Sequence, residues 1–588
     1  MRNTPRLFRK TGSPAPSSPP DLPRFGKKLF ALLLLGTALH SPALQAQTQR
    51  NWIGGNGTEL DWALPANWQG SNVPVSPDYF AQFLAGTSAK INVPGGSSTA
   101  RMTLDGNTDI ELVLGSTGGA FTLDALLRVG NTNAGAAHLK FTGTGTLEGN
   151  SFNIGASAAS ADGNSLTFAG STSISFTGVN ATSYVGRFGS NNLLSISNGN
   201  TNRLSTLYIG YEGGDGNNRA VISGAGTTVI VQDSGSNRGV RIGSVTAGTS
   251  YATGMQNNYI EIKSGARLAL TSNGANSNQI TIGGQAYAHG NSLTIEGEGS
   301  TLELRKGAAT IGDGATITIG NSDQSNRGGN SVKVSHGGSI VSEAGHAGNI
   351  TIYGHDSSGE NAGANSLVIG DEGRVAINGN IVINGGSVIL SATGELSAGN
   401  ITVGSGGRLE LSGRDFSTHG ANGTVVGNAG TVAARSDAQN GAAGLLVNSA
   451  LSLSTGSILE LDLPGNPSDP AIELGSSGLL KIASGVTLKL ILEEDHTPQA
   501  GEEWILFGGE TTQISGAFDL LVLPDLAEGL SWDLRTFNET GGWRVGVIPE
   551  ASAIHLALAA VLPLLFLRSG IAHRRRRRLS LSQNMTNL

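Results

Sequence analysis

Two phrases decide the fold of this 588-residue chain: NYIEIKSGARL at residues 258–268 and NSLTIEGEGSTL at residues 291–302. Each begins with asparagine, continues as a short run in which apolar and polar residues alternate, and then reaches a turn that contains glycine. Leu293 and Ile295 would lie on one side of such a strand and Thr294 on the other, because side chains alternate along a strand. The phrases therefore predict short strands that bury one face.

The asparagine phrase recurs through the middle of the chain, and its spacing of roughly 25 to 40 residues is typical of repeat proteins. A second phrase, in which a β-branched residue leads into glycine, lies between most of the copies, as in Thr281-Ile282-Gly283. Self-similarity on this scale indicates a solenoid, because one repeat cannot bury its apolar face until it stacks on another. The phrases start at Asn164, Asn192, Asn218, Asn258, Asn291, Asn330 and Asn365.

We therefore predict an all-β fold in which residues 91–463 form a right-handed parallel β-helix, a solenoid with a narrow apolar core. Two alternatives are an array of β-sandwiches and a partly disordered tract rich in Gly, Asn and Ser. Sandwich domains have about 100 residues each, roughly three times the observed repeat. Disorder is disfavoured by the regular strands and by a hydrophobic content of 38%.

Composition argues against nucleic acid as a partner. Segments 1–46 and 549–588 together hold 13 of the 37 basic residues but only two of the 44 acidic ones, so the segment between them carries 24 basic and 42 acidic residues. Such an excess of negative charge repels a phosphate backbone. The chain has no cysteine, so its stability must come from packing and hydrogen bonds rather than from disulfides.

Residues 1–46 have the pattern of an export signal. Basic residues from Arg24 to Lys28 precede the apolar run 29–39, and small residues follow up to Ala46. This order is typical of a secretory signal peptide. We predict a signal peptide with a long basic leader and cleavage after Ala46.

The C-terminal residues 549–578 predict a membrane anchor. The apolar run 551–567 is about long enough to cross the hydrocarbon core of a bilayer as a helix. The helix of a soluble core would show an amphipathic period instead. By the positive-inside rule, the arginines after the run place the C-terminus in the cytoplasm. These stop-transfer residues are Arg568, Arg574, Arg575, Arg576, Arg577 and Arg578.

The order of these parts resembles the PEP-CTERM sorting signal of bacterial exported proteins, which combines a Pro-Glu-Pro tripeptide, one hydrophobic helix and an Arg-rich end. The tripeptide position here reads Pro549, Glu550 and Ala551, so the last proline is replaced. The resemblance implies recognition by an exosortase, a membrane cysteine protease, with cleavage near the tripeptide. The alternative is a tail anchor that is never cut.

Two tryptophan-containing modules flank the repeats. Residues 47–90 hold Trp52, Trp62 and Trp68 and resemble the start of bacterial surface proteins with autotransporter-associated β-strand repeats. We predict that this module is a cap on the first coil, the alternative being a platform on which sugars stack. Residues 471–547, after a proline-rich joint, resemble the segment that often precedes a PEP-CTERM tail, and we predict a C-terminal β-rich module there.

No pattern predicts a catalytic, cofactor or metal site. Polysaccharide lyases and hydrolases also use the parallel β-helix, but their sites need clustered carboxylates on neighbouring coils. The aspartates of the repeats are isolated and lie mostly in turns, where aspartate is common, and the step His355-Asp356 is interpreted in the same way. Residues 213–218 slightly resemble a calcium-binding nonapeptide, but the pattern occurs once, so we interpret it as a turn.

These observations predict an exported cell-surface or extracellular-matrix protein of structural, adhesin-like type, and not an enzyme. The expected partners are an exosortase-type sorting protease, the membrane through the C-terminal helix, and extracellular polysaccharide held by many weak contacts. The alternative is a secreted β-helix polysaccharide lyase or glycoside hydrolase. A carboxylate cluster on one face of the fold would favour the enzyme.

Overall fold

The computed structural model describes residues 47–550 with internal gaps. The predicted signal peptide with its cleavage site at Ala46 lies outside the described residues, as does the predicted membrane helix 551–567 with Ala551, Arg568 and the arginines 574–578. The gaps are 55–56, 133–134, 157–161, 179–180, 212–215, 234–238, 245–254, 273–278, 286, 306–314, 323–326, 356–362, 413–415, 436–444, 464–469, 493–495, 510–512 and 538–542.

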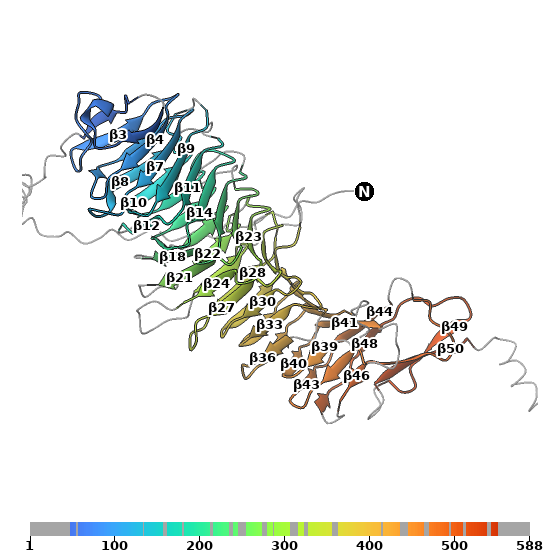
Figure 1. The fold of residues 1–588 in the computed structure, drawn as a ribbon. Helices are drawn as coiled ribbons and strands as arrows, with labels where there is room; N and C mark the ends of the chain where they lie inside the picture. Colours follow the sequence, from blue (N-terminus) through green and yellow to red (C-terminus); the bar gives the residue numbers. More distant parts are fainter. Residues whose placement is uncertain are drawn as a thin grey trace, which may run out of the picture. The chain divides into compact units, whose positions relative to one another are not determined.

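Three strands make one coil of the fold, and successive coils pair in parallel (Figure 1). In one coil β20 (Tyr259–Lys263) lies on a first face, β21 (Arg267–Ser272) on a second face and β22 (Gln279–Ile282) on a third face. The chain then returns to the first face as β23 (Ser292–Glu296), which pairs with β20 in register. The fold is therefore an all-β parallel solenoid, as the asparagine phrases predict.

Each face is an open ladder of parallel strands. The first face holds β2 (Gly57–Asp61), β4 (Ser88–Val93), β7 (Asp109–Leu114), β9 (His138–Gly143), β11 (Ser165–Ala169), β14 (Leu193–Ser197), β17 (Arg219–Ser223), β20, β23, β26 (Ser331–Ser335), β29 (Ser366–Ile369), β32 (Ser387–Leu390), β35 (Arg408–Leu411), β38 (Thr431–Ala434), β41 (Ile458–Leu463), β44 (Thr487–Leu492) and β48 (Leu520–Val522). The second face holds β5 (Ser98–Thr99), the first halves of β8 (Phe121–Val129) and β10 (Thr146–Ile154), β12 (Ser173–Phe176), β15 (Thr201–Leu204), β18 (Thr228–Asp233), β21, β24 (Thr301–Leu304), β27 (Ser339–Ser342), β30 (Arg374–Ala376), β33 (Glu395–Ala398) and β36 (Phe416–Thr418), and the short sheet of β39 (Leu445–Val447), β42 (Ile472–Leu474) and β46 (Phe507–Gly508) follows it. The third face holds β1 (Thr48–Asn51), β3 (Tyr79–Phe83), β6 (Met102–Leu104), the second halves of β8 and β10, β13 (Ser183–Val185), β16 (Leu207–Ile209), β19 (Val240–Ile242), β22, β25 (Thr316–Ile319), β28 (Asn349–Tyr353), β31 (Asn380–Asn384), β34 (Asn400–Val403), β37 (Thr424–Val426), β40 (Ala450–Leu453), β43 (Leu479–Ile482) and β47 (Ile514–Ser515).

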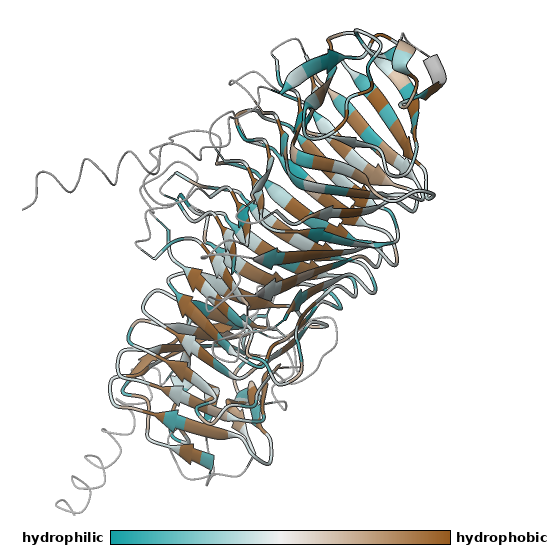
Figure 2. Cartoon of the chain, turned by 90° about the vertical axis from the view of Figure 1, so that its left-hand side faces the viewer, coloured by the Kyte–Doolittle hydropathy of each residue, from teal (hydrophilic) through white to brown (hydrophobic). Residues whose placement is uncertain are grey.

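Each coil buries a narrow apolar core. Ile260, Leu268 and Ile280, one from each face of a single coil, are all fully buried. Hydrophobic and polar residues alternate along the strands (Figure 2). The next apolar residue of a strand, two positions further on, therefore lies on the same, inner side of the sheet. In-register stacking places aliphatic side chains of one coil on those of the next, and burial of each CH₂ group contributes about 0.8 kcal/mol.

A file of buried asparagines runs along the corner between the third and first faces. The Nδ2 atom of each asparagine donates to the Oδ1 atom of the next one along the stack, at 2.8 to 3.1 Å. The same Oδ1 accepts the backbone N–H of the preceding asparagine at 3.0 to 3.2 Å. The seven members, all with 0% exposure, are Asn164, Asn192, Asn218, Asn258, Asn291, Asn330 and Asn365.

The glycine phrase makes room for this file. Gly210 has a φ of 70°, a left-handed conformation that favours glycine, and a Cβ there would lie 2.4 Å from the side chain of Asn258. A Cβ at Gly283 would likewise lie too close to the side chain of Asn330. The two sequence phrases therefore meet at one corner, in which the bare backbone of a glycine accommodates the amide that begins the coil after the next.

Aromatic rings fill the N-terminal end of the coil stack. Trp52, Trp62 and Trp68 are 4%, 0% and 0% exposed, and they pack edge-to-face around Phe83 and Phe121. The short 3₁₀ helix η1 (Pro65–Asn67) brings Trp68 back, and its Nε1 donates to the carbonyl oxygen of Trp62 at 2.8 Å. Buried rings leave no free indole face at these three positions for stacking on a sugar.

Parallel pairing continues across the predicted joint between residues 463 and 471. β43 pairs with β40 and β44 with β41, so coils of the solenoid extend into the predicted C-terminal module. Beyond them β45 (Glu503–Ile505), β50 (Arg544–Pro549) and β49 (Leu530–Asp533) form a small antiparallel sheet. Trp504, the middle residue of β45, is fully buried.

Apart from η1, regular secondary structure between residues 47 and 550 consists of strands wherever the chain is described. No helix in that part of the chain has the length and apolar character needed to span a bilayer. The predicted span 551–567 falls outside it.

Candidate functional site

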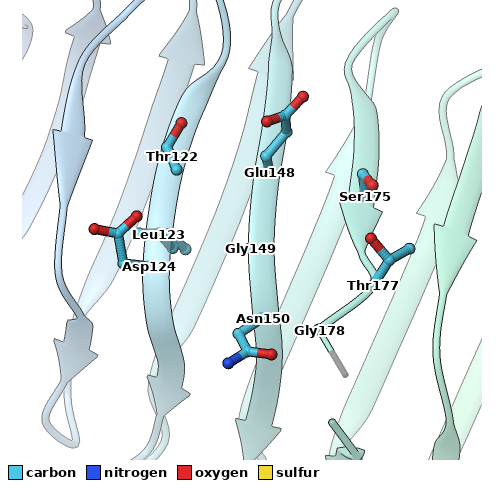
Figure 3. A pocket seen from close by; sticks show the side chains of 9 residues that line it. All are labelled: Thr122, Leu123, Asp124, Glu148, Gly149, Asn150, Ser175, Thr177 and Gly178. Atoms are coloured by element: carbon cyan, nitrogen blue, oxygen red, sulfur yellow. The ribbon is translucent and has the colours of Figure 1, made fainter. Parts of the chain in front are cut away.

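A shallow open groove of about 660 Å³ crosses the second face close to its corner with the third face (Figure 3). Strands β8, β10 and β12, which belong to successive coils, form its floor. The lining residues are Thr122, Leu123, Asp124, Glu148, Gly149, Asn150, Ser175, Thr177 and Gly178.

The groove exists because β8 and β10 turn the corner without a break. Each is a nine-residue strand that pairs with second-face strands in its first half and third-face strands in its second half. The register between them shifts between Gly149 and Ser151, as at a β-bulge. A Cβ at Gly149 would lie 2.5 Å from the ring of Phe176, and one at Gly178 would overlap the amide of Asn150, so glycine is required at both positions.

Polar groups line the groove in two rows. Thr122, Glu148 and Ser175 stand opposite one another in the strand register. Two residues further on, Asp124 and Asn150 project from the outer surface of their strands (Figure 3). The rows offer carboxylate, amide and hydroxyl groups to a ligand on the surface, and they contain no aromatic ring and no cation.

The groove holds two carboxylates that could be considered as a hydrolytic pair, because Asp124 and Glu148 come from neighbouring strands. Both side chains are exposed, whereas a general acid works best in a desolvated setting. Within the described residues, no three His, Cys, Asp or Glu side chains gather where they could hold a metal ion. The arrangement suits hydrogen bonds to hydroxyl groups, which both carboxylates and amides can accept.

Few of the residues singled out from the sequence come together. Pro549 lies in β50 opposite Leu530, and the N–H of Glu550 donates to the carbonyl oxygen of Gly529 at 2.7 Å. Asp356 and residues 213–215 of the calcium-like turn lie outside the described residues. Asn218, at the end of that turn, belongs instead to the buried asparagine file.

Two features were missed in the sequence. His496 and Glu502, from the segments that surround Trp504, lie with Nε2 and Oε2 3.1 Å apart. The groove lies partly in the coils of β8 and β10, which precede Asn164, so no asparagine phrase marks the register of those two coils. The signal that was available is the pair of nine-residue strand-like runs at 121–129 and 146–154, the second of which has Gly149 and Asn150 at the corner.

Comparison with known proteins does not assign the chain to a family. No family model matches the chain, and no curated protein matches it. A crystal structure of a hyper-glycosylated TibA fragment, whose glycosylation is catalysed by TibC, is similar over 73% of this chain and 100% of that chain, with 14% sequence identity and a TM-score of 0.22. A likeness at that level adds nothing to the fold that the strand pairing already establishes.

Proposed function

We propose that this protein is an exported cell-surface or extracellular-matrix protein of structural, adhesin-like type that binds extracellular polysaccharide along its coil stack, and that it is not an enzyme. The observation that supports this most directly is the in-register stacking of seventeen strands on the first face. Such stacking repeats an outward row of side chains about every 4.8 Å. A linear polymer lying along a face meets one row after another, so many weak contacts sum to a useful affinity.

The groove around Asp124 and Glu148 is the proposed contact for sugar hydroxyl groups. Its open shape admits the middle of a chain as well as an end, and its polar lining matches a hydroxyl-rich ligand better than an apolar one. We also propose that the coils wind to the right, as nearly all parallel crossovers do.

Export and sorting complete the proposal. The signal pattern of residues 1–46 and the sorting pattern of residues 549–578 would carry the solenoid across the inner membrane and hand it to an exosortase-type protease. The tripeptide position begins at the last residue of β50, so cleavage after it would separate the predicted anchor from the last sheet.

A β-helix polysaccharide lyase or hydrolase remains the second candidate, because Asp124 and Glu148 lie on neighbouring strands of one face. Enzyme and adhesin differ in what happens to a bound glycan. Only an enzyme would shorten the polymer, and its rate would fall by orders of magnitude when a carboxylate is replaced by an amide.

The test uses the mature protein purified from its native host and a panel of neutral polysaccharides. We expect binding without shortening of the polymer, and about a fivefold loss of affinity in Asp124→Asn/Glu148→Gln, as the loss of one or two hydrogen bonds predicts. Asp109→Asn, which removes an exposed carboxylate from the first face of nearby coils, is the matched control and should bind as the wild type does. Depolymerisation that disappears in the double variant would favour the enzyme, and an uncut C-terminus in the mass spectrum of the mature protein would contradict sorting.

A further inference from the structure

One row of side chains along the middle of the third face, which is buried at Gln82, Thr103, Asn153 and Tyr208, has no acidic residue at its described positions. The strand register aligns seventeen described positions from Asn51 to Ser515 in this row. Its charged members are Arg128, Arg241 and Lys481, all basic. The segment between the two ends of the chain holds 42 acidic and 24 basic residues, so the charge of this row is opposite in sign to that of the segment as a whole.

Arginines gather at the N-terminal part of this row. Arg101 and Arg187 flank Arg128 closely enough that both lower the pKa of its guanidinium, after burial, which lowers that pKa most. Arg101 and Arg128 make no ion pair with any residue that the structure describes. The Nε atom of Arg101 is buried without a hydrogen-bond partner. Cations are thus held against one another in a protein whose net charge is negative, and an anion would relieve their repulsion.

Aromatic rings hold Arg187 in place. The guanidinium carbon of Arg187 lies 5.3 Å from the ring centre of Tyr184 and 5.0 Å from that of Phe188. Tyr184 packs in turn on Tyr208 and Tyr211, which are 2% and 8% exposed. Burial and then the neighbouring Tyr211 raise the pKa of Tyr184 to about 12, so its phenol stays neutral in neutral solution. A cation fixed on aromatic rings loses less entropy when a ligand binds.

The strand register gives the order and spacing of the members of this row along the coil stack. Arg128 is aligned with Asn153, then with Tyr184 and Tyr208, and then with Arg241, so the two arginines lie four strand spacings apart, about 19 Å along the stack. The amide oxygen of Asn153, between them, is buried and has no hydrogen-bond partner. Threonines continue the row beyond Arg241, where hydroxyl groups can donate to a polar ligand.

We propose that this row binds a linear polysaccharide that carries carboxylate groups, with the chain lying along the stack and its acidic groups on Arg101, Arg128 and Arg187. The inference rests on the proposed function and names the ligand class within it. Guanidinium groups form paired hydrogen bonds with carboxylates, which a neutral sugar cannot accept in the same way. The neighbouring groove, which carries Asp124 and Glu148, would then meet uncharged hydroxyl groups of the same polymer.

Duplex nucleic acid fits this row less well. Its phosphates lie on two strands and need basic residues spread over a broad surface, typically 6–10 contacts for strong binding. The row is one side chain wide, and only three of its aligned positions are basic. The surrounding excess of acidic residues would repel the rest of a duplex.

Two matched ligands test the proposal: a neutral glucan, and the same glucan oxidised at its primary alcohols to uronic acid. We expect the oxidised glucan to bind the wild-type protein at least about tenfold more tightly, with an affinity that falls as salt is added. Arg128→Gln/Arg187→Gln should lose this preference and keep its affinity for the neutral glucan. Arg203→Gln, which removes an exposed arginine from the second face, should retain the preference.

The outcomes separate the two proposals. If neither glucan binds, the proposed function fails; if both bind equally well, only the acidic ligand class is overturned. Equal or tighter binding of a DNA duplex, lost in the same double variant, would also overturn it in favour of nucleic acid. A purely structural role for the arginines would lower the urea midpoint of the variant and its affinity for both glucans, whereas relief of repulsion predicts an unchanged or higher midpoint.

Discussion

The coils from Asn164 to Asn365 and the coils that follow them form the corner between the third and first faces in different ways. In the first set the residue before each first-face strand is a buried asparagine, and these asparagines recur at the long and uneven intervals seen in the sequence. In the second set the same position is taken by Gly386, Gly407 and Gly430, whose carbonyl oxygens accept the N–H of the next strand just as the asparagines do. One coil between these glycines has only about 20 residues, the lower end of the range for solenoid repeats.

The difference shows what allows a coil of this fold to vary in length. A short coil closes its corner with a tight turn, such as the bond from the N–H of Gly407 to the carbonyl oxygen of Gly404 at 3.0 Å. A long coil carries an insertion of variable length at its corner. The amide file then anchors both ends of the corner through side-chain hydrogen bonds that do not depend on loop length.

The two regions also differ on the outside. In the later coils, Arg408, Arg435 and Lys489 surround Glu460 on the first face, with nitrogen–oxygen distances of 2.7, 3.1 and 3.0 Å. The exposure of Glu460 is only 8%. Ion pairs across coils therefore reinforce stacking in this region. The earlier region has an ion pair across coils as well, between Arg267 and Glu303, and adds neutral amides in its interior.

The largest effect is expected from closing the space that the asparagine file needs. Gly210→Ala places a Cβ 2.4 Å from the side chain of Asn258 at a φ of 70°. We expect a loss of about 4 kcal/mol in unfolding free energy, from backbone strain and a broken amide file together. The measurement is urea unfolding with hydrogen exchange read coil by coil, because solenoids need not unfold in one step.

Gly345→Ala is the control for this substitution. Its φ is 77°, nearly that of Gly210, but a Cβ there meets nothing within 4 Å. It should cost about 1 kcal/mol, the strain term alone. Equal losses at the two glycines would show that the amide file adds nothing to the corner.

Removing one amide should have a smaller effect. Asn258→Ala deletes the acceptor of two bonds from Asn218 and the donor of one to Asn291, all of them buried. We expect a loss of about 3 kcal/mol and faster exchange of the backbone N–H of Asn218. Ser457→Ala in the later region removes one bond, to the carbonyl oxygen of Ser454, and should cost about 1 kcal/mol.

The sequence predicts these regions unequally, for a physical reason. Asparagine, glycine and alternation mark every long coil, so the repeats from Asn164 to Asn365 were visible in the sequence. Contacts between coils are set by loop lengths, and a face row such as the one from Arg128 to Arg241 cannot be aligned until the pairing is known. The groove could not be predicted for the same reason, because Asp124 and Glu148 lie in coils without an asparagine phrase.

The sequence shows the tryptophans as a cluster, and the structure adds that Trp62 and Trp68 are fully buried.

The smallest effect concerns the ion pairs of the later coils and should depend on pH. Burial opposes ionisation of Glu460, but hydrogen bonds and charges from Arg408 and Lys489 outweigh it and lower its pKa below the ordinary value. A carboxyl with a lowered folded pKa stabilises the fold above its unfolded pKa, and this contribution is lost as pH falls through the folded value. Glu460→Gln should therefore cost about 2 kcal/mol at pH 7, and the difference from wild type should shrink in acid below its ordinary pKa and in 1 M salt.

The matched control is Glu395→Gln, which breaks an exposed pair with Arg374 and should cost at most about 0.5 kcal/mol. Asn258→Ala supplies the opposite check, because a buried neutral amide has no charge to titrate or screen, and its cost should be the same at pH 4 and pH 7. If the Asn258 deficit changed with pH as the Glu460 deficit does, the distinction between an interior fastened by amides and an exterior fastened by charges would be wrong.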